Sequence, residues 1–397
     1  NTSIDKQFDG KFSVENRYDY LNLNTCRFLW KQVKFPTATD ASNTTAQVLK
    51  QGETQGSDVA AHSAGVLNIK TTILPDADAL FLTAIDRYGH ELWRWTFPVN
   101  KLNQANEVLS PLSNKVTSTE TENELTVKAK NHTFIFSKKD GQLKGVSVNN
   151  RKISFANGPR FIGARRADRS LDQFYNHDDE KAKEKDRTYS EFPDAAVFTK
   201  LDVKEDGGNL IVTANYKLGN LDKVQWTINP NGEAVLDYTY NFSGVVDLMG
   251  ICFDYPEDQV ISKRWLGAGP YRVWQNRIHG TQYDVWENDY NDPIPGETFT
   301  YPEFKGYFGS VSWMNIRTKE GTISLTNETP DAYIGVYQPR DGRDRLLYTL
   351  PESGISVLNV IPPVRNKVNS TDLCGPSSQP KWVNGPQSGR IIFRFME

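Results

Sequence analysis

The spacing of hydrophobic residues predicts short β-strands in the first hundred residues. Apolar side chains recur at every second position, which turns one face of a strand toward a core. The clearest runs are residues 12–14, 28–30, 67–73 and 93–97. Residues 37–58 are polar and predict a long loop or a weak hairpin. About six short strands in this length are typical of an immunoglobulin-like β-sandwich.

A second, longer block of strands follows a polar stretch. Residues 101–122 are rich in Ser, Thr and Asn and show no periodicity, as expected of a linker. The β pattern resumes at Glu124 and continues to the end, with more than a dozen predicted strands. That number exceeds an immunoglobulin module and predicts a large two-sheet sandwich. We therefore assign residues 1–105 to the first sandwich, 106–122 to the linker and 123–397 to the second sandwich.

Only one segment has a helical pattern. Residues 178–187 are almost wholly charged and predict a solvated loop or a short exposed helix. The alternative is a metal site that uses Asp178, Asp179 and Glu180. No cofactor-binding motif occurs in the sequence. The binding of a structural cation such as calcium remains an open alternative.

Aromatic and basic residues concentrate in residues 263–277, which read KRWLGAGPYRVWQNR. Gly and Pro seldom occupy the middle of a strand, so a strand is predicted to end at Trp265–Leu266 before a sharp turn. Aromatic faces beside guanidinium groups suit a sugar, which offers apolar C–H faces and hydroxyls. The alternative is a corner between sheets with aromatic packing. The side chains presented beyond the turn are Tyr271, Arg272, Trp274 and Arg277.

A second basic cluster lies in residues 159–170. Several guanidinium groups on one surface favour a carboxylate or sulfate ligand, because Arg meets planar anions in a bidentate manner. The alternative is local pairing with Asp168, Asp172 and Asp178. The cluster consists of Arg160, Arg165, Arg166 and Arg169.

Composition excludes several classes of protein. A net charge of -3 argues against nucleic acid as the main partner. The chain has no run of about 18 apolar residues, so no membrane span is predicted. Three widely spaced cysteines imply neither a disulfide framework nor a zinc ribbon. The sequence begins at Asn1 without an initiator Met or an apolar leader segment, so we interpret the chain as a mature or excised piece.

Three stretches carry a resemblance to a known family. Residues 14–31, VENRYDYLNLNTCRFLWK, look like the opening of the immunoglobulin-like module of β-galactosidase-like enzymes in glycoside hydrolase family 2. RWLGAGPYRVWQNR is similar to the motif LGxGPxENYPDR, and STDLCGP at 370–376 is similar to the turn D-S-W-G/S-P. Members of that family follow a catalytic (β/α)8 barrel with this module and a β-supersandwich. The resemblance implies an all-β fold in which the second sandwich is a galactose-mutarotase-like β-supersandwich.

This sequence departs from the family pattern at three places. Arg272 and Val273 stand where the pattern has Glu-Asn, and Cys374 aligns with a Trp of the sugar platform. Residues 164–170 replace the acidic segment A-P-x-D-N-D with arginines. We therefore expect a different glycoside from lactose, such as one that contains a uronic acid.

The resemblance implies a non-catalytic role, because the acid/base and nucleophile glutamates of the family lie on the barrel. The expected partners are that barrel and a carbohydrate, and the chain alone should hydrolyse no glycoside. If the source is a bacterium, we expect a periplasmic or extracellular location, which the sequence itself does not establish. The residues expected to contact carbohydrate are Tyr271, Arg272, Trp274, Arg277, Trp286, Arg165 and Arg166.

Two functions of other classes remain open. Since the supersandwich also resembles aldose mutarotases, the chain could be an epimerase that uses His279 and Glu303. It could also be a stand-alone carbohydrate-binding protein.

Overall fold

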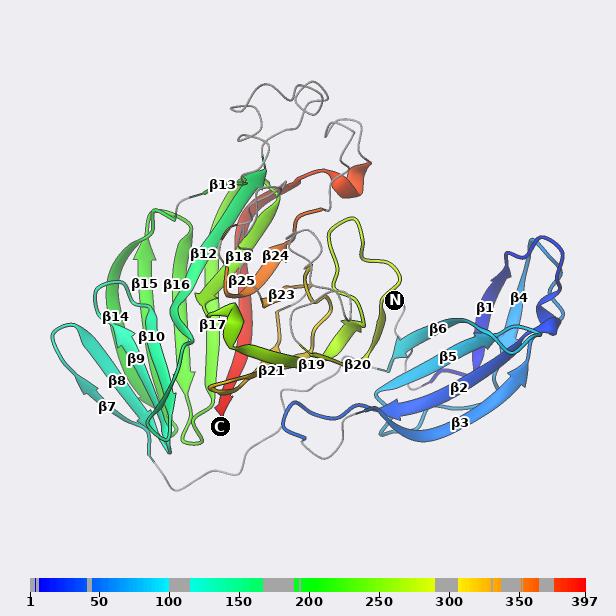
Figure 1. Ribbon diagram of the computed structural model, residues 1–397, viewed down its shortest axis with the longest axis horizontal. Coiled ribbons are helices and arrows are strands. Elements are labelled where there is room, and N and C mark those ends of the chain that lie inside the picture. The colour runs from blue at the N-terminus through cyan, green and yellow to red at the C-terminus, as the bar shows by residue number, and fades with distance from the viewer. Residues whose placement is uncertain are drawn as a thin grey trace. The chain divides into compact units, whose positions relative to one another are not determined.

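The fold is all-β, as predicted. The computed structural model describes residues 4, 7–40, 45–99, 115–166, 189–192, 194–289, 306–329, 331–336, 351, 353–363 and 375–397. Within them every long element is a strand, and the helical segments are single 3-10 turns (Figure 1). The chain divides into two compact units, Asn1–Asn106 with Gln282–Trp286, and Glu107–Thr281 with Glu287–Glu397. The helical candidate at 178–187 lies outside the described residues.

The first unit contains two antiparallel sheets. Strands β1 (Lys11–Asn16) and β4 (Ser63–Asn68) form a two-stranded sheet. The second sheet has the order β3-β2-β5-β6, from Gln47–Gln55, Arg27–Lys34, Ala79–Ile85 and Glu91–Pro98. Its core includes Phe28, Trp30 and Leu67, which the alternating pattern had assigned to buried faces.

Of the two alternatives predicted for residues 37–58, a long loop or a weak hairpin, the structure has a strand, β3, that pairs antiparallel with β2. It is an edge strand whose residues are mostly exposed or half-buried, so polar side chains suit it. Its partner β2 supplies the buried residues Phe28, Trp30 and Val33. Gly52 lies opposite Trp30, and a Cβ there would stand 2.4 Å from the indole. The alternation of apolar and polar residues could not predict β3, because that alternation occurs in its partner β2 and not in β3 itself.

The second unit contains two large sheets. The ten-stranded sheet has the order β23-β24-β18-β12-β10-β9-β8-β7, with β11 on β10 and β13 on β12. The nine-stranded sheet has the order β14-β15-β16-β17-β25-β22-β21-β19-β20. The first sheet consists of β7 (Thr117–Glu120), β8 (Glu124–Ala129), β9 (His132–Ser137), β10 (Leu143–Val148), β11 (Arg151–Ile153), β12 (Ala156–Arg166), β13 (Tyr189–Glu191), β18 (Leu248–Asp254), β23 (Tyr333–Val336) and β24 (Ile355–Val360). The second consists of β14 (Val197–Asp206), β15 (Asn209–Lys217), β16 (Leu221–Ile228), β17 (Ala234–Val246), β19 (Val260–Gly269), β20 (Gln282–Asp289), β21 (Trp313–Thr318), β22 (Gly321–Asn327) and β25 (Lys381–Met396).

Several strands of this unit were not predicted from the sequence, among them β7, β12 and β18. Residues 117–120 fall in the predicted linker, yet they form β7, whose exposed polar side chains sit on the edge of the sheet. Strand β18 is buried at six consecutive positions, so it shows no alternation. Strand β12 contains Gly158 and Pro159, which read as a break although pairing with β18 resumes at Arg160.

Aromatic side chains fill the space between the two large sheets. Phe155 stacks on Phe253 at 4.5 Å between ring centroids and lies 5.2 Å from Phe393 of β25. Trp226 of β16 meets Phe253 edge to face at 6.1 Å. All four residues are almost fully buried. Offset and edge-to-face arrangements of this kind add to the stabilisation from burial alone.

Glu320 links elements of both sheets through one carboxylate. The residue follows β21, and its side chain accepts hydrogen bonds from the backbone N–H (2.8 Å) and hydroxyl (2.6 Å) of Ser154, which precedes β12. The Tyr255 hydroxyl, just after β18, also donates to Glu320 at 3.2 Å. Burial raises the pKa of Tyr255 well above its usual value, and the Glu320 charge raises it further, so the phenol remains a donor at physiological pH.

Replacing Glu320 by Ala should lower the free energy of unfolding by about 2 kcal/mol, because three donors lose a charged acceptor. Urea unfolding followed by tryptophan fluorescence would measure the change. Glu205→Ala is the matched control, since its ion pair with Lys115 is largely exposed and should be worth well under 1 kcal/mol. Equal effects of the two substitutions would contradict the role of Glu320.

Candidate functional site

The glycines of the GAGP turn lie inside strand β19 instead of ending it. The strand runs from Val260 to Gly269, three residues beyond the predicted end at Leu266. A Cβ at Gly267 would lie 3.0 Å from the Val311 Cα and 3.1 Å from the Ser310 carbonyl oxygen. Glycine is therefore required because another backbone segment passes close to the strand, and no positive φ is involved. The Trp265 indole donates to the Ala268 carbonyl at 3.0 Å.

A short bridge follows the turn and brings two distant segments together. The backbone groups of Val273 and Tyr307 exchange hydrogen bonds of 2.7 and 2.8 Å. The Arg277 N–H then donates to the Trp274 carbonyl at 2.8 Å and closes a tight turn. This geometry leaves Tyr271 66% exposed, and Arg277 and His279 are also exposed.

Trp274 differs from its predicted position. It is 5% exposed and meets Tyr307 edge to face at 5.5 Å. It belongs to a buried cluster with Val273 and with residues of β12 and β24. Its indole therefore cannot offer a face to a sugar in this structure, and the alternative of aromatic packing at a corner applies to it.

Gln275 anchors the segment to the start of the last strand. Its side-chain amide donates to the carbonyl oxygens of Ser377 (2.9 Å) and Gln379 (2.6 Å). The Asn276 amide donates to the Ser378 hydroxyl at 2.9 Å. Ser377 and Ser378 belong to the 3-10 turn η6 (Pro376–Ser378). The motif at 263–277 thus contacts the residues that directly follow the stretch at 370–376, whereas Cys374 lies outside the described residues.

Arg272 is half-buried beneath the exposed residues. Its guanidinium lies 6.0 Å from the centre of the Phe308 ring. Its Cβ would come within 2.9 Å of a Cβ built at Gly306, so a glycine is needed there, and the φ of +39° at that position also favours one. The Arg272 side chain is therefore packed against the segment at Gly306–Phe308.

The arginines of β12 do not join this surface. Ile162 and Ala164 pack in the same buried cluster as Trp274, so the alternation of the strand turns Arg165 to the opposite face. The backbone of Arg166 pairs with Tyr189, and nothing about its side chain is described. Arg169 lies outside the described residues.

Arg160 pairs with an aspartate, although not with one of those named in the alternative interpretation of the cluster, since Asp168, Asp172 and Asp178 lie outside the described residues. It bonds the Asp254 carboxylate at 2.7 Å and the Asn157 carbonyl at 2.8 Å. Its other terminal nitrogen lies 3.7 Å from the Cys252 sulfur. Burial raises the pKa of Cys252 to about 11 despite the nearby guanidinium, so the thiol remains protonated at neutral pH.

Trp286 belongs to the first unit and is not grouped with Tyr271. Its indole donates to the Gln282 carbonyl at 3.1 Å, and the Arg94 guanidinium lies 5.9 Å from its ring. Arg94 also pairs with Asp284 at 2.9 Å. Burial raises the pKa of Asp284, whereas the Arg94 charge opposes the rise. Trp286 is half-buried, and its contact with carbohydrate stays a prediction.

The sequence analysis missed an exposed tryptophan. Trp382 is 71% exposed and begins β25 three residues after Gln379, one of the acceptors of Gln275. Its neighbours in the sequence are polar or small and gave no signal of a surface aromatic. The exposure of Trp382 therefore depends on the tertiary structure and not on the local sequence.

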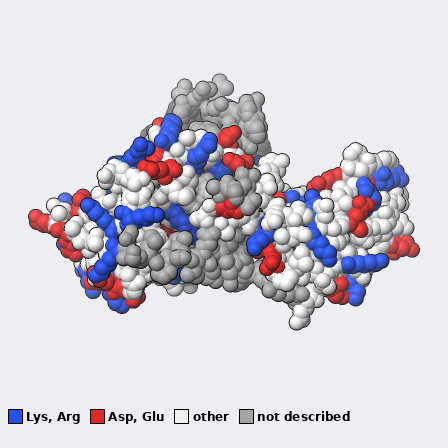
Figure 2. All heavy atoms as spheres, turned by 90° about the horizontal axis from the view of Figure 1, so that it is seen from below, with Lys and Arg blue, Asp and Glu red and all other residues white. Residues whose placement is uncertain are grey.

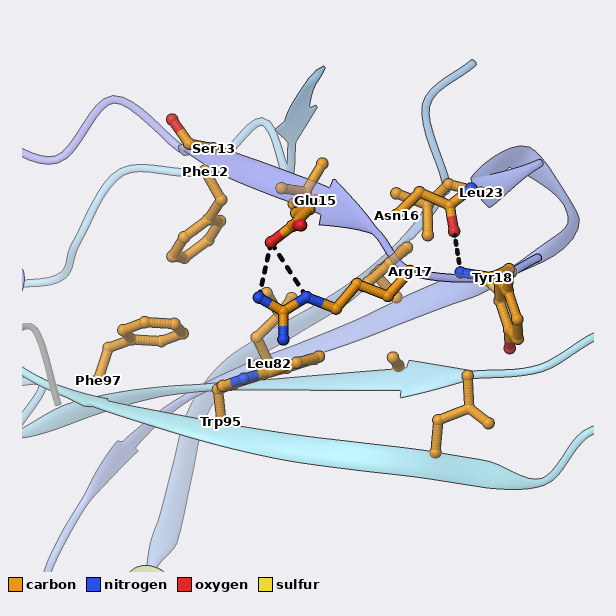
Figure 3. Close-up of a pocket in the computed structure, with 15 residues that line it drawn as sticks. Phe12, Ser13, Glu15, Asn16, Arg17, Tyr18, Leu23, Leu82, Trp95 and Phe97 are labelled. Atoms are coloured by element: carbon orange, nitrogen blue, oxygen red, sulfur yellow. Dashed lines mark hydrogen bonds and ion pairs between the residues drawn. The ribbon is translucent and has the colours of Figure 1, made fainter. Parts of the chain in front are cut away.

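A cavity of about 470 Å³ in the first unit is a poorer candidate for a sugar site (Figure 3). Its walls are mostly apolar, and Glu15 pairs with Arg17 at 2.8 Å among the residues that line it. The Asn16 amide in its lining donates to the carbonyl oxygens of Leu21 (2.8 Å) and Val59 (2.9 Å), so this polar group is engaged by the protein itself. Its apolar lining includes Phe12, Val14, Tyr18, Leu82, Trp95 and Phe97.

The described residues show no metal site. Among them, no group of three or more His, Cys, Asp or Glu side chains could hold a metal ion. Asp178, Asp179, Glu180 and Glu303 fall outside that part of the chain. No helix in the described ranges is long and apolar enough to cross a membrane. Both signs of charge are interspersed on the face that Figure 2 shows, in keeping with the net charge of -3.

Removing the Gln275 side chain should loosen the segment beyond the turn. Gln275→Ala loses two hydrogen bonds, so backbone amides of residues 271–279 should exchange with deuterium faster. Asn276→Ala loses one bond and should give a smaller change. Hydrogen exchange with mass spectrometry would measure both. Unchanged protection in Gln275→Ala would contradict the anchoring role.

Comparison with known proteins identifies the family. The sequence model described as "Beta galactosidase small chain" matches residues 128–361, whereas no curated protein sequence matches the chain. Similar solved structures include a galactose 1-epimerase from Lactobacillus acidophilus NCFM (8% identity, TM-score 0.40, 72% of this chain and 99% of that chain). Another is a putative mutarotase, YeaD, from Salmonella typhimurium (8% identity, TM-score 0.31, 71% and 94%). Likenesses this weak carry no argument about activity. Because the family model covers more than half of the 397 residues, the chain belongs to the β-galactosidase small-chain family.

Proposed function

We propose that the chain forms the non-catalytic C-terminal domains of a family 2, β-galactosidase-like glycoside hydrolase. The observation that carries the proposal is the family match over residues 128–361. The first unit, with its two small sheets, would be the immunoglobulin-like module that precedes the supersandwich. In this role the two units support the catalytic barrel, which supplies both glutamates.

The segment at 271–279 is the part of the chain best suited to reach a sugar. Tyr271 offers an exposed aromatic ring, and Arg277 offers an exposed guanidinium. The hydrogen bonds from Gln275 and Asn276 hold the segment in place, which reduces the entropy lost when a ligand binds. Sugar affinity of the chain alone should be weak, because a partial site encloses little of the ligand.

An acidic sugar fits the basic residues of this segment. Arg272 stands where the family pattern has Glu, and Arg277 follows five residues later. Guanidinium groups bind planar carboxylates through two parallel hydrogen bonds, which suits a uronic acid. The packing of Arg272 beside Phe308 limits its movement, so Arg277 is the freer of the two for direct contact.

The purified chain should hydrolyse no nitrophenyl galactoside or glucuronide, because cleavage of a glycosidic bond needs two suitably spaced carboxylates and the family places both on the barrel. Release of nitrophenol would be followed by absorbance, with a complete family 2 β-galactosidase as the positive control. Hydrolysis by the chain alone would overturn the proposal.

Arg272→Ala and Arg277→Ala should each weaken binding of uronic-acid oligosaccharides several-fold and leave neutral galactosides little changed. Isothermal titration calorimetry would measure both ligands. Arg317→Ala, at an exposed position in β21, is the matched control. Binding of neutral galactosides alone, unaffected by Arg272→Ala, would contradict an acidic ligand while leaving the family role intact.

A further inference from the structure

The outer face of the nine-stranded sheet carries a line of polar residues that the preceding function does not use. Along β25, Phe393 and Phe395 point into the core, so the alternate residues point outward. Ser388 and Arg390 are exposed on this outer side. Exposure continues at every second residue to Trp382, at the start of the strand.

Neighbouring strands extend this line into a surface. The register places Thr239 of β17 opposite Ser388 and opposite Lys223 of β16. One step along, Asp237 lies between Arg390 and Gln225. Toward Trp382, the Ser243 hydroxyl donates to the Asn384 amide oxygen at 2.7 Å. Hydroxyl and amide groups from three strands therefore share one face.

The surface is hollowed where these strands meet. A groove of about 390 Å³ opens on it, a volume within the range of small-molecule sites. The polar face of an antiparallel sheet commonly meets water, but that alone explains neither a groove nor an exposed indole. The lining side chains include Lys223, Gln225, Thr239, Glu328, Ser388 and Arg390.

The charges in the groove largely cancel. Arg390 lies 3.2 Å from Asp237 and 3.3 Å from Glu328, so one cation is held between two carboxylates. Lys223 adds a second positive charge at the groove. The two cations and two anions leave no net charge, so the remaining hydroxyl and amide groups favour a neutral ligand with many hydroxyls.

Trp382 supplies an apolar platform on the same face. Its indole is 71% exposed and offers a flat apolar face on which a sugar ring can stack. Eight residues separate it from Arg390, or about 27 Å at 3.4 Å per residue. A ligand that contacts both must be long, as an oligosaccharide of several sugars is.

We propose that the outer face of β16, β17 and β25 binds a neutral oligosaccharide. One sugar stacks its C–H face on Trp382, and others lie toward the groove, where Gln225, Thr239 and Ser388 bond their hydroxyls. A peptide strand would add to the backbone at a sheet edge, whereas the groove side chains of β16 and β17 lie on strands that are paired on both sides. Of these three strands, only β25 has an unpaired stretch in the described part of the chain, since β22 pairs with it from Ile391 to Met396 alone. The proposal does not depend on the role of Tyr271 or Arg277.

The test is calorimetric titration of the full 397-residue chain with galactohexaose, cellohexaose, mannohexaose and an oligogalacturonate of equal length. At least one neutral hexasaccharide should bind, and Trp382→Ala should leave any binding of the oligogalacturonate at residues 271–279 unchanged. Trp382→Ala should weaken the neutral interaction about tenfold, because it removes the stacking surface. The double variant Gln225→Ala/Ser388→Ala should weaken it about threefold or more.

Two variants serve as controls. Trp93→Ala removes another exposed tryptophan, from β6 of the first unit, and should leave binding unchanged. Tyr271→Ala should also leave it unchanged; if Tyr271→Ala abolishes binding and Trp382→Ala does not, the ligand sits at residues 271–279 and the proposal fails while the proposed function stands. Thermal melts of every variant separate loss of contact from loss of folding. No binding of any neutral hexasaccharide would also overturn the proposal.

Discussion

The aromatic layer between the two large sheets is the constraint on which the second unit depends. Phe155, Phe253, Phe393 and Trp226 come from segments far apart in the sequence and pack face to face or edge to face. Their burial fixes which side of each strand points inward, because a slip of one residue would expose every ring. The outward side is then fixed as well, so the positions of Trp382 and the groove residues follow from the core.

Hydrogen bonds from single polar side chains stabilise the loops that lie outside this aromatic layer. Glu320 ties residues near β12 and β18 to the turn after β21, and Gln275 ties the segment beyond β19 to the turn before β25. Both use one side chain to satisfy several backbone or hydroxyl partners from distant segments. Such contacts stabilise irregular backbone that no sheet can pair, and a functional rim is built of this kind of backbone.

The sequence predicted most strands of the fold, but it predicted less well which side chains are exposed at residues 271–279. Alternation located strands such as β2, β16 and β17, because each has one buried and one half-exposed face. It missed β3, whose apolar partners lie on the neighbouring strand, and β18, which is buried on both faces. Of the residues expected to contact sugar, Tyr271 and Arg277 are exposed as predicted, whereas Trp274 is buried against Tyr307.

The sequence by itself determined the all-β class and the family, because strand periodicity and the motifs at 263–277 and 370–376 are local patterns. Only the tertiary structure decided which aromatic and basic side chains are available. Arg165 turns away from the turn segment because its neighbour Ala164 is buried in the cluster that holds Trp274. Trp382 stands in the open because no described element covers the start of β25. Exposure depends on what another segment places over a side chain, and that information is not local to any stretch of sequence.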